Sequence, residues 1–448
     1  MNKRSVVIMS ILAIILSICL IGCSTSVEIP KQVETPKQVE TEKTKVEVSE
    51  TMNIGFDKFD SDLINYIENS EDYKTENFVV SPVSIKLALG LTIEGAQDET
   101  KIELLNALGI ENENSLRELS KEMSDISSDV EERVASEIEY FKRYYEEGAI
   151  NKSKFIVTNS IWKNKDRGGK ISEDYQKIVL NHYNAKSEEI TSLQMKETIN
   201  DYVKKNTNNL IKEIVDDEVK NANTVLVNTV YLNDSWSEGL FDEYNTKEKD
   251  FTTIDKSKVK KDFMTTQDDF LYYEDKETKL LLTLTKNDFG VLYVLGDNSN
   301  ILEKMNKMES CEVIVEVPKM DIESTFDNKY LVGFMNSLGV KKAFDPINAN
   351  FGNMFDGLNS DFNIYIEDII HKTKLTTDEK GIEAAAATAV IMYDGITALP
   401  PQKPLPKEFI ANEPFSFYVF NMNQINNSDS DNISFDKTKL LFYGNYVK

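Results

Sequence analysis

The order of helix-like and strand-like segments is the feature that most limits how this chain can fold. The first third of the sequence shows apolar residues at helical spacing, as in 56–67 and 85–93. From residue 155 onward, short apolar or β-branched runs follow one another, each bounded by Asn, Asp, Gly, Lys or Pro. These predicted strands are 155–162, 223–232, 280–284, 291–295, 313–317, 362–370, 415–420 and 439–447.

Helical spacing returns among these runs at 197–214 and 329–338, and residues 112–150 resemble one or two exposed helices. Strands and helices do not alternate regularly, so the pattern predicts an α+β fold with large mixed or antiparallel sheets and surrounding helices. Composition does not change abruptly after residue 52. We therefore expect residues 52–448 of the 448-residue chain to form one domain.

Charge and histidine content exclude several functions. The formal net charge is -25, so we expect no binding to nucleic acid, which needs Lys and Arg to neutralise phosphates. The chain has two histidines, His182 and His371, which are too few for a three-histidine zinc site, and no nucleophile motif accompanies them. We expect a protein that is not an enzyme and holds no metal or cofactor.

The N-terminus has the pattern of an exported protein. Lys3 and Arg4 precede an uncharged apolar run at 6–21, as in a signal peptide. The sequence Leu-Ile-Gly-Cys that ends at Cys23 resembles the lipobox of bacterial lipoproteins. That resemblance implies cleavage of residues 1–22 and diacylation of Cys23, and two acyl chains anchor a protein stably. A simple secreted protein and an uncleaved signal anchor are the alternatives.

Residues 24–51 show no apolar periodicity, and they contain a hexapeptide, Pro-Lys-Gln-Val-Glu-Thr, twice in succession. Such a segment cannot bury a core, so we expect residues 23–51 to be a lipidated cysteine followed by a disordered tether. The expected location is the extracellular face of a bacterial cell membrane. Cys19 lies within the apolar run, so the mature chain has no disulfide framework, and we expect Cys311 to be a buried structural thiol.

Residues 379–406 differ from the rest of the chain. Four consecutive alanines, Ala384 to Ala387, precede a proline-rich stretch. The residues favour a short alanine helix and a strand about equally. As a strand, Ile382, Ala384, Ala386 and Thr388 share one small or apolar face, which could enter a sheet without needing a large cavity.

Several separated motifs resemble the serpin family. The segment Gly381–Ala389 (GIEAAAATA) resembles the hinge of the serpin reactive-centre loop. Residues 77–84 (NFVVSPVS) are similar to the family's first strand-to-helix motif, and 226–232 to the third strand of its main sheet. A His-Lys pair at 371–372 and closing strands at 413–417 and 442–444 complete the resemblance, which covers about residues 53–448.

The resemblance implies a serpin fold with an exposed reactive-centre loop at about 379–410. In serpins a target serine protease acylates itself on the loop, the cleaved loop inserts into the central sheet, and the acyl-enzyme is trapped. We therefore expect an irreversible suicide-substrate inhibitor, a monomer whose partners are its target protease and, through the lipid anchor, a membrane. A non-inhibitory serpin that serves as a surface binding protein is the alternative, and a solute-binding lipoprotein is a third class.

The resemblance also assigns roles to individual residues. Counting from the hinge places the scissile bond at Gly395–Ile396. Because the loop is several residues longer than is usual in serpins, cleavage after Asp394, Ala398 or Leu399 is an alternative. The absence of a nearby Arg favours a subtilisin-like or elastase-like target. Serpin hinges usually carry Thr, Ser or Val where this chain has Ile382, whose bulk could slow insertion. The hinge comprises Glu379, Gly381, Ile382, Glu383, Ala384, Ala385, Ala386, Ala387, Thr388 and Ala389.

Five further residues match two buried regions of the serpin sheet. Ser81, Ser84, Asn228 and His371 match the "shutter", a polar cluster beneath the sheet that must open during insertion. Trp236 matches the "breach", where insertion begins. For His371 this implies a hydrogen-bonding role and not a catalytic one.

Overall fold

The computed structural model describes residues 57–144, 152–326, 328–357, 364–366, 369–382, 405–422, 435 and 438–448. Contacts between Cα atoms divide the chain into residues 1–49 and 50–448, and every described residue belongs to the second unit. Its helices are α1 (Lys58–Glu68), α2 (Pro82–Gly95), α3 (Asp98–Leu108), α4 (Asn114–Tyr144), α5 (Glu173–Tyr183), α6 (Met195–Asn206), α7 (Ile301–Met305) and α8 (Asn328–Ser337).

The described strands form a six-stranded sheet, a nine-stranded sheet and a two-stranded sheet. In order across the six-stranded sheet the strands are β11 (Met320–Phe326), β13 (His371–Asp378), β14 (Gly381–Ile382), β5 (Thr224–Ser235), β2 (Lys154–Asn164) and β4 (Lys186–Ile190). The two-stranded sheet pairs β12 (Phe355–Asp356) with β3 (Lys170–Ile171).

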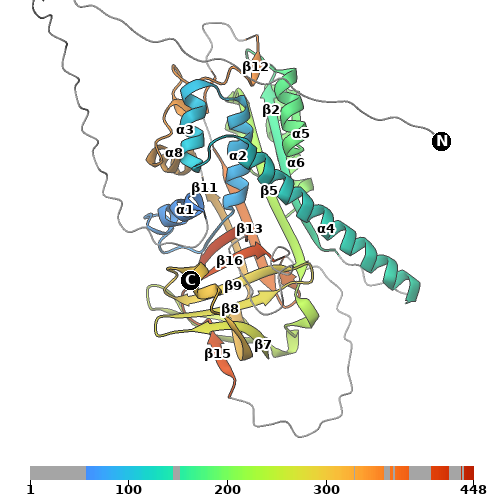
Figure 1. Cartoon of the computed structure of the whole chain (residues 1–448), viewed down its shortest axis with the longest axis vertical. Helices are drawn as coiled ribbons and strands as arrows, with labels where there is room; N and C mark the ends of the chain where they lie inside the picture. Colours follow the sequence, from blue (N-terminus) through green and yellow to red (C-terminus); the bar gives the residue numbers. More distant parts are fainter. Residues whose placement is uncertain are drawn as a thin grey trace, which may run out of the picture. The chain divides into compact units, whose positions relative to one another are not determined.

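The nine-stranded sheet is antiparallel except for one parallel pair, β10 with β15. In order its strands are β1 (Phe78–Val80), β17 (Leu440–Tyr446), β16 (Phe415–Asn421), β9 (Phe289–Gly296), β8 (Thr278–Leu284), β7 (Lys258–Glu274), β10 (Glu309–Pro318) and β15 (Lys407–Ile410), with β6 (Lys247–Thr252) beside β7. The two large sheets and the surrounding helices agree with the predicted α+β class (Figure 1).

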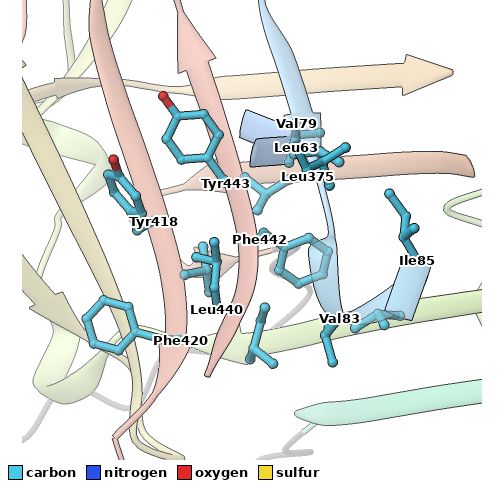
Figure 2. Close-up of a cluster of buried hydrophobic side chains, with 14 of the residues drawn as sticks. Leu63, Val79, Val83, Ile85, Leu375, Tyr418, Phe420, Leu440, Phe442 and Tyr443 are labelled. Atoms are coloured by element: carbon cyan, nitrogen blue, oxygen red, sulfur yellow. The ribbon is translucent and has the colours of Figure 1, made fainter. Parts of the chain in front are cut away.

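Helix α2 lies at the centre of the core. Almost all of its residues are buried, and it packs against both β5 and β17. Its N-cap is Ser81, whose side chain accepts a hydrogen bond from the Ser84 backbone, and Pro82 occupies the first turn. The helix therefore begins three residues before the predicted start at Ile85. Figure 2 shows side chains from α1, α2 and both sheets meeting in this core, among them Leu63, Leu375 and Phe442.

Helix α6 covers β2 and β5 through a second apolar cluster, in which Ile199 and Val203 pack with Trp162 and Val227. The helix ends at Asn206, well before the predicted end at residue 214. It is followed by two asparagines in the left-handed region, Asn208 and Asn209, which cannot continue an α-helix.

Helix α4 is one long helix, where the sequence indicated one or two exposed helices. One of its faces is buried, with Met123 and Val130 in the main core. Ser127 donates a hydrogen bond to the carbonyl of Phe155 on β2. The predicted strand at 362–370 is wrong for its described residues, because the strand begins only at His371.

Candidate functional site

The short strand β14 lies between β5 and β13 and is antiparallel to both. Ile382 pairs with Thr377 and Asp234, and Gly381 pairs with Asp378 and Ser235. Beyond β14, no described residue of β5 pairs with one of β13. We call the line along which β5 and β13 face each other beyond β14 the seam.

Glycine is required at the first position of β14. Gly381 has a φ of +154°, and a Cβ atom there would lie 2.1 Å from the carbonyl oxygen of Asp234. This contact is with backbone, which cannot move aside as a flexible side chain could. Any other residue would therefore push β14 away from β5.

Trp236 holds the segment that leads into β14. Its indole nitrogen donates to the carbonyl of Asp378 over 2.7 Å, and its backbone nitrogen donates to the carbonyl of Lys380 over 3.0 Å. The ring is buried and packs edge-on against Phe241, with ring centroids 5.8 Å apart. The predicted breach residue thus bonds the two residues on either side of the hinge residue Glu379.

Glu379 precedes β14 and is buried. It lies 2.7 Å from the ammonium nitrogen of Lys319 and accepts a hydrogen bond of 2.5 Å from Thr246. Burial by itself would raise the pKa of Glu379, but the hydrogen bonds from Lys319 and Thr246 outweigh it and lower the pKa. The carboxylate therefore stays charged at neutral pH and fixes the entry to β14.

At the other end of the seam, His371 begins β13. Its Nε2 lies 3.1 Å from the backbone nitrogen of Ser81 and 2.7 Å from the hydroxyl of Thr373. A backbone N–H can only donate, so Nε2 must be the unprotonated acceptor and the ring proton sits on Nδ1. Burial lowers the pKa of His371 to about 3. The side chain is therefore neutral at physiological pH.

Ser84 and Asn228 continue this polar cluster. The Ser84 hydroxyl donates to the amide oxygen of Asn228, and the Asn228 amide nitrogen donates to Asn159 over 2.6 Å. Asn159 in turn donates to the carbonyl of Tyr183 over 2.9 Å. All four predicted shutter residues are buried and lie around the same end of the seam, where they join α2, β5 and β13.

Two cavities lie along the seam. The larger has a volume of about 40 Å³ and is bounded by α2, β5 and the start of β13, with Ser84, Asn228 and His371 in its wall. The smaller, of about 10 Å³, lies next to β14 and is bounded by Leu232, Leu375 and Ile382, among others. The first is large enough for about three water molecules, the second for about one at most.

Sequence reasoning missed the residues that complete both ends of the seam. Thr373 and Asn159 complete the hydrogen bonds of one end, and Lys319 and Thr246 those of the other. For Thr373 a signal existed, because it stands two residues after His371 and so on the same face of a strand. The other three come from distant segments and carry no local signal.

Several predicted site residues lie outside the described residues: the hinge residues Glu383–Ala389, the bond Gly395–Ile396 and the lipidation site Cys23. Among the described residues, no group of three metal-ligand side chains comes together, and no helix combines the length and apolar character needed to span a membrane. Cys311 is a partly buried free thiol, and burial raises its pKa.

Comparison with known proteins identifies the family. A family model described as Serpin (serine protease inhibitor) matches residues 56–427, so the chain belongs to the serpin family. An uncharacterized serpin-like protein of Methanosarcina acetivorans is 27% identical over 384 residues, which are 81% of this chain and 82% of that protein. Serpins are generally protease inhibitors rather than enzymes.

Solved structures share the fold. The native state of the thermophilic serpin tengpin superposes with a TM-score of 0.65 at 24% identity, over 90% of this chain and 95% of that one. Thyroxine-binding globulin in complex with thyroxine gives 0.64 at 20% identity, over 88% and 98%. The predicted serpin fold is confirmed.

Proposed function

We propose that the protein is a suicide-substrate inhibitor of subtilisin-like or elastase-like serine proteases. The protease serine hydroxyl adds to the carbonyl carbon of Gly395, and the bond to the Ile396 nitrogen breaks. That nitrogen leaves as an amine that carries the hydroxyl proton, and an acyl-enzyme ester remains. Insertion of the freed segment into the seam then carries the protease to the far pole and deforms its active site, so that the ester is not hydrolysed.

The observation that carries this proposal is β14 itself. Its two residues already pair with β5 and β13 in the antiparallel sense that an inserted strand needs. Beyond it the two neighbouring strands offer backbone groups along a seam with cavities at both ends. An added strand would satisfy those groups and fill those cavities, which favours the inserted state.

The register of β14 predicts where each hinge residue would lie. Because β14 is antiparallel to both neighbours, each step forward along the loop is one step back along β5 and along β13. The predicted sets of partners are Ala384 with Leu232 and Leu375, Ala386 with Val230 and Thr373, and Thr388 with Asn228 and His371. Ala384 would thus lie between two leucines, and Ala386 between a valine and a threonine.

At the far end of the seam, Thr388 would arrive beside the shutter residues. Its hydroxyl can both donate and accept, as the polar wall of the larger cavity requires. Ile382 is compatible with the same path, since it is already buried at a strand position beside Leu232 and Leu375. Its bulk therefore does not prevent the first step of insertion.

A non-inhibitory serpin is the second candidate, because thyroxine-binding globulin has the same fold in complex with a small molecule. Such a protein would present its loop without trapping a protease. The hinge favours inhibition, since the four alanines and Thr388 combine small size with strand compatibility.

The lipobox supports an anchor at the extracellular face of a bacterial membrane, through diacylated Cys23 and the tether. In this location a monomeric inhibitor would meet proteases that attack the cell surface. Cell fractionation tests the anchor: the native chain should sediment with membranes, whereas Cys23→Ser should not. Equal partitioning of the two would refute lipidation.

To test inhibition, residues 24–448 are mixed with subtilisin or pancreatic elastase and resolved on denaturing gels. A band at the summed mass that survives boiling, with a released peptide that begins at Ile396, is the expected result. Ala384→Arg should be cut without forming this band, because insertion would bury a charge between Leu232 and Leu375. Ala384→Val should retain it. Cleavage of the native chain without complex, across a wider protease panel, would refute the proposal.

A further inference from the structure

Two strongly exposed hydrophobic side chains flank the reactive-centre loop. In the described part of the chain, the large hydrophobic side chains that are more than nine-tenths exposed are Leu193 at 91%, Tyr244 at 92% and Leu405 at 91%. Single exposed apolar side chains are common and need no explanation by themselves. Their positions are informative, because Tyr244 lies beside the residues that enter the loop and Leu405 beside those that leave it.

Tyr244 sits on a closed turn, η4 (Glu243–Asn245). The carboxylate of Asp242 accepts a hydrogen bond of 2.9 Å from the Tyr244 backbone, and the Asp242 carbonyl accepts one of 2.9 Å from Asn245. The backbone nitrogen of Thr246 donates to the carbonyl of Glu243 over 3.3 Å. The turn thus fixes the tyrosine backbone through its own bonds.

The same turn is bound to the base of the loop. Thr246 donates to Glu379, and the carboxylate of Glu243 lies 3.6 Å from the ammonium nitrogen of Lys380. An aromatic side chain on a fixed turn loses little entropy when a partner covers it, which is what a binding anchor needs.

Leu405 lies on the other side of the loop, two residues before β15. Strand β15 pairs in parallel with β10, with Lys407 opposite Val313. Glu379 bonds both Thr246 and Lys319, so the Tyr244 turn lies near the other end of β10. At about 3.3 Å per residue, the path from Leu405 along β10 to Lys319 is about 25 Å. A standard interface of about 800 Å² per partner spans a similar width, so one globular partner can contact both side chains.

We propose that Tyr244 and Leu405 contact the target protease beside its active-site cleft while the loop occupies that cleft. This inference rests on one part of the proposed function, which is that a protease cuts the loop; it does not require that the protease is trapped. Asp242 and Glu243, which are both exposed, precede Tyr244 in the turn, so the complementary protease surface is apolar with a basic rim, where an Arg or Lys can lie over the ring.

The length of the loop explains why such a contact matters. Twenty-four residues separate Ile382 from Lys407, and the predicted scissile bond lies among them. A second contact on the body raises the effective concentration of the bond to be cut and so speeds association.

The test compares Tyr244→Ala, Leu405→Ala and the double variant with Leu193→Ala. Leu193 is the matched control, because its side chain is equally exposed. It lies in η1 (Ser192–Gln194), where Ser192 donates a hydrogen bond to Asp166. Asp166 lies four residues before β3, which pairs with β12. Strands β12 and β15 lie at opposite ends of the described domain (Figure 1). The measured quantity is the second-order rate of loop consumption, complex plus cleaved product, with subtilisin and with elastase.

We expect Tyr244→Ala to slow consumption about fivefold to tenfold, the double variant to slow it further, and Leu193→Ala to leave it unchanged. The ratio of complex to cleaved product should not change, because neither side chain enters the sheet. Tyr244→Phe should keep most of the rate.

Equal rates for all variants, with every protease that cuts the loop, would overturn the proposal. A changed ratio of complex to cleaved product would overturn it too, because Tyr244 would then act through the hinge contacts of its turn. If native protein is cut without complex, the proposed function fails, yet the cleavage rates still report docking. A loop that no protease cuts would overturn both.

Discussion

The two ends of the seam are held by different kinds of interaction. At the β14 end, backbone pairing, a glycine-only contact at Gly381 and the charged pair Glu379–Lys319 fix the start of a strand. At the other end, His371 and Asn228 belong to a buried network without net charge. The first end can extend without breaking its bonds. The second end must break and replace its bonds before a strand can pass.

The largest expected effect comes from Gly381→Ala. The new Cβ would lie 2.1 Å from the Asp234 carbonyl oxygen, so β14 should leave the sheet. We expect the yield of covalent protease complex to fall by about tenfold or more. Hydrogen exchange should show faster exchange of the Ile382 amide.

The matched control for this change is Gly109→Ala. Gly109 also has a positive φ, +65°, but a Cβ atom at this position would have no neighbouring atom within 4 Å. This variant should lose about 1 kcal/mol of stability and keep complex formation. Equal complex yields for the two variants would contradict the role given to β14.

The second prediction concerns the far end of the seam. His371→Ala removes the acceptor of the buried Ser81 N–H and leaves a cavity next to Thr373. We expect a loss of about 2–4 kcal/mol in the free energy of unfolding, measured by urea denaturation. His182→Ala, at an exposed position on α5, should change it by less than about 0.5 kcal/mol. Similar losses for both histidines would contradict the network.

Apolar strands could be predicted from the sequence and polar ones could not. The runs that became β2, β5, β8, β9, β10, β16 and β17 are rich in Val, Ile, Leu and Phe. Strand β13 was missed because its buried face is His371, Thr373, Leu375 and Thr377, with a single aliphatic side chain. His371 and Thr373 on this face form hydrogen bonds, and a hydropathy pattern does not reveal such bonds.

The site could be predicted as a set of motifs but not as a set of contacts. Residues such as Trp236 and Ser84 were found through resemblance to the family. Lys319, by contrast, bonds Glu379 from a position 60 residues earlier in the chain. Only the fold brings such residues together, because neither the adjacent residues nor their spacing in the sequence predicts the contact between Lys319 and Glu379.

The third prediction uses pH to separate the two ends. Folding lowers the pKa of His371 to about 3, so on acidification the unfolded chain takes up this proton first. The stability due to neutral His371 is complete above about pH 6.5 and is lost as the pH falls toward 3, at about 1.4 kcal/mol per pH unit.

His371→Gln isolates this term, because burial also raises the pKa of Asp60 to about 6 and gives the opposite slope below that pH. Subtracting the unfolding free energies of the variant from those of the native chain should give a curve that is flat above about pH 6.5 and falls below it. A difference curve that is flat down to pH 4 would show that His371 titrates normally.

The smallest expected effect is at Lys319, and ionic strength makes it informative. Its side chain is more than a third exposed, so Lys319→Met should cost only about 1 kcal/mol although Glu379 is buried. Because the pair is partly open to solvent, this cost should shrink when salt rises from about 0.05 M to about 0.5 M. The cost of His371→Ala should not change over the same range, since that network carries no charge. Lys307→Met, which breaks an exposed pair with Glu303, should be near zero throughout. If salt weakened both ends of the seam equally, the distinction between a charged end and a neutral end would be wrong.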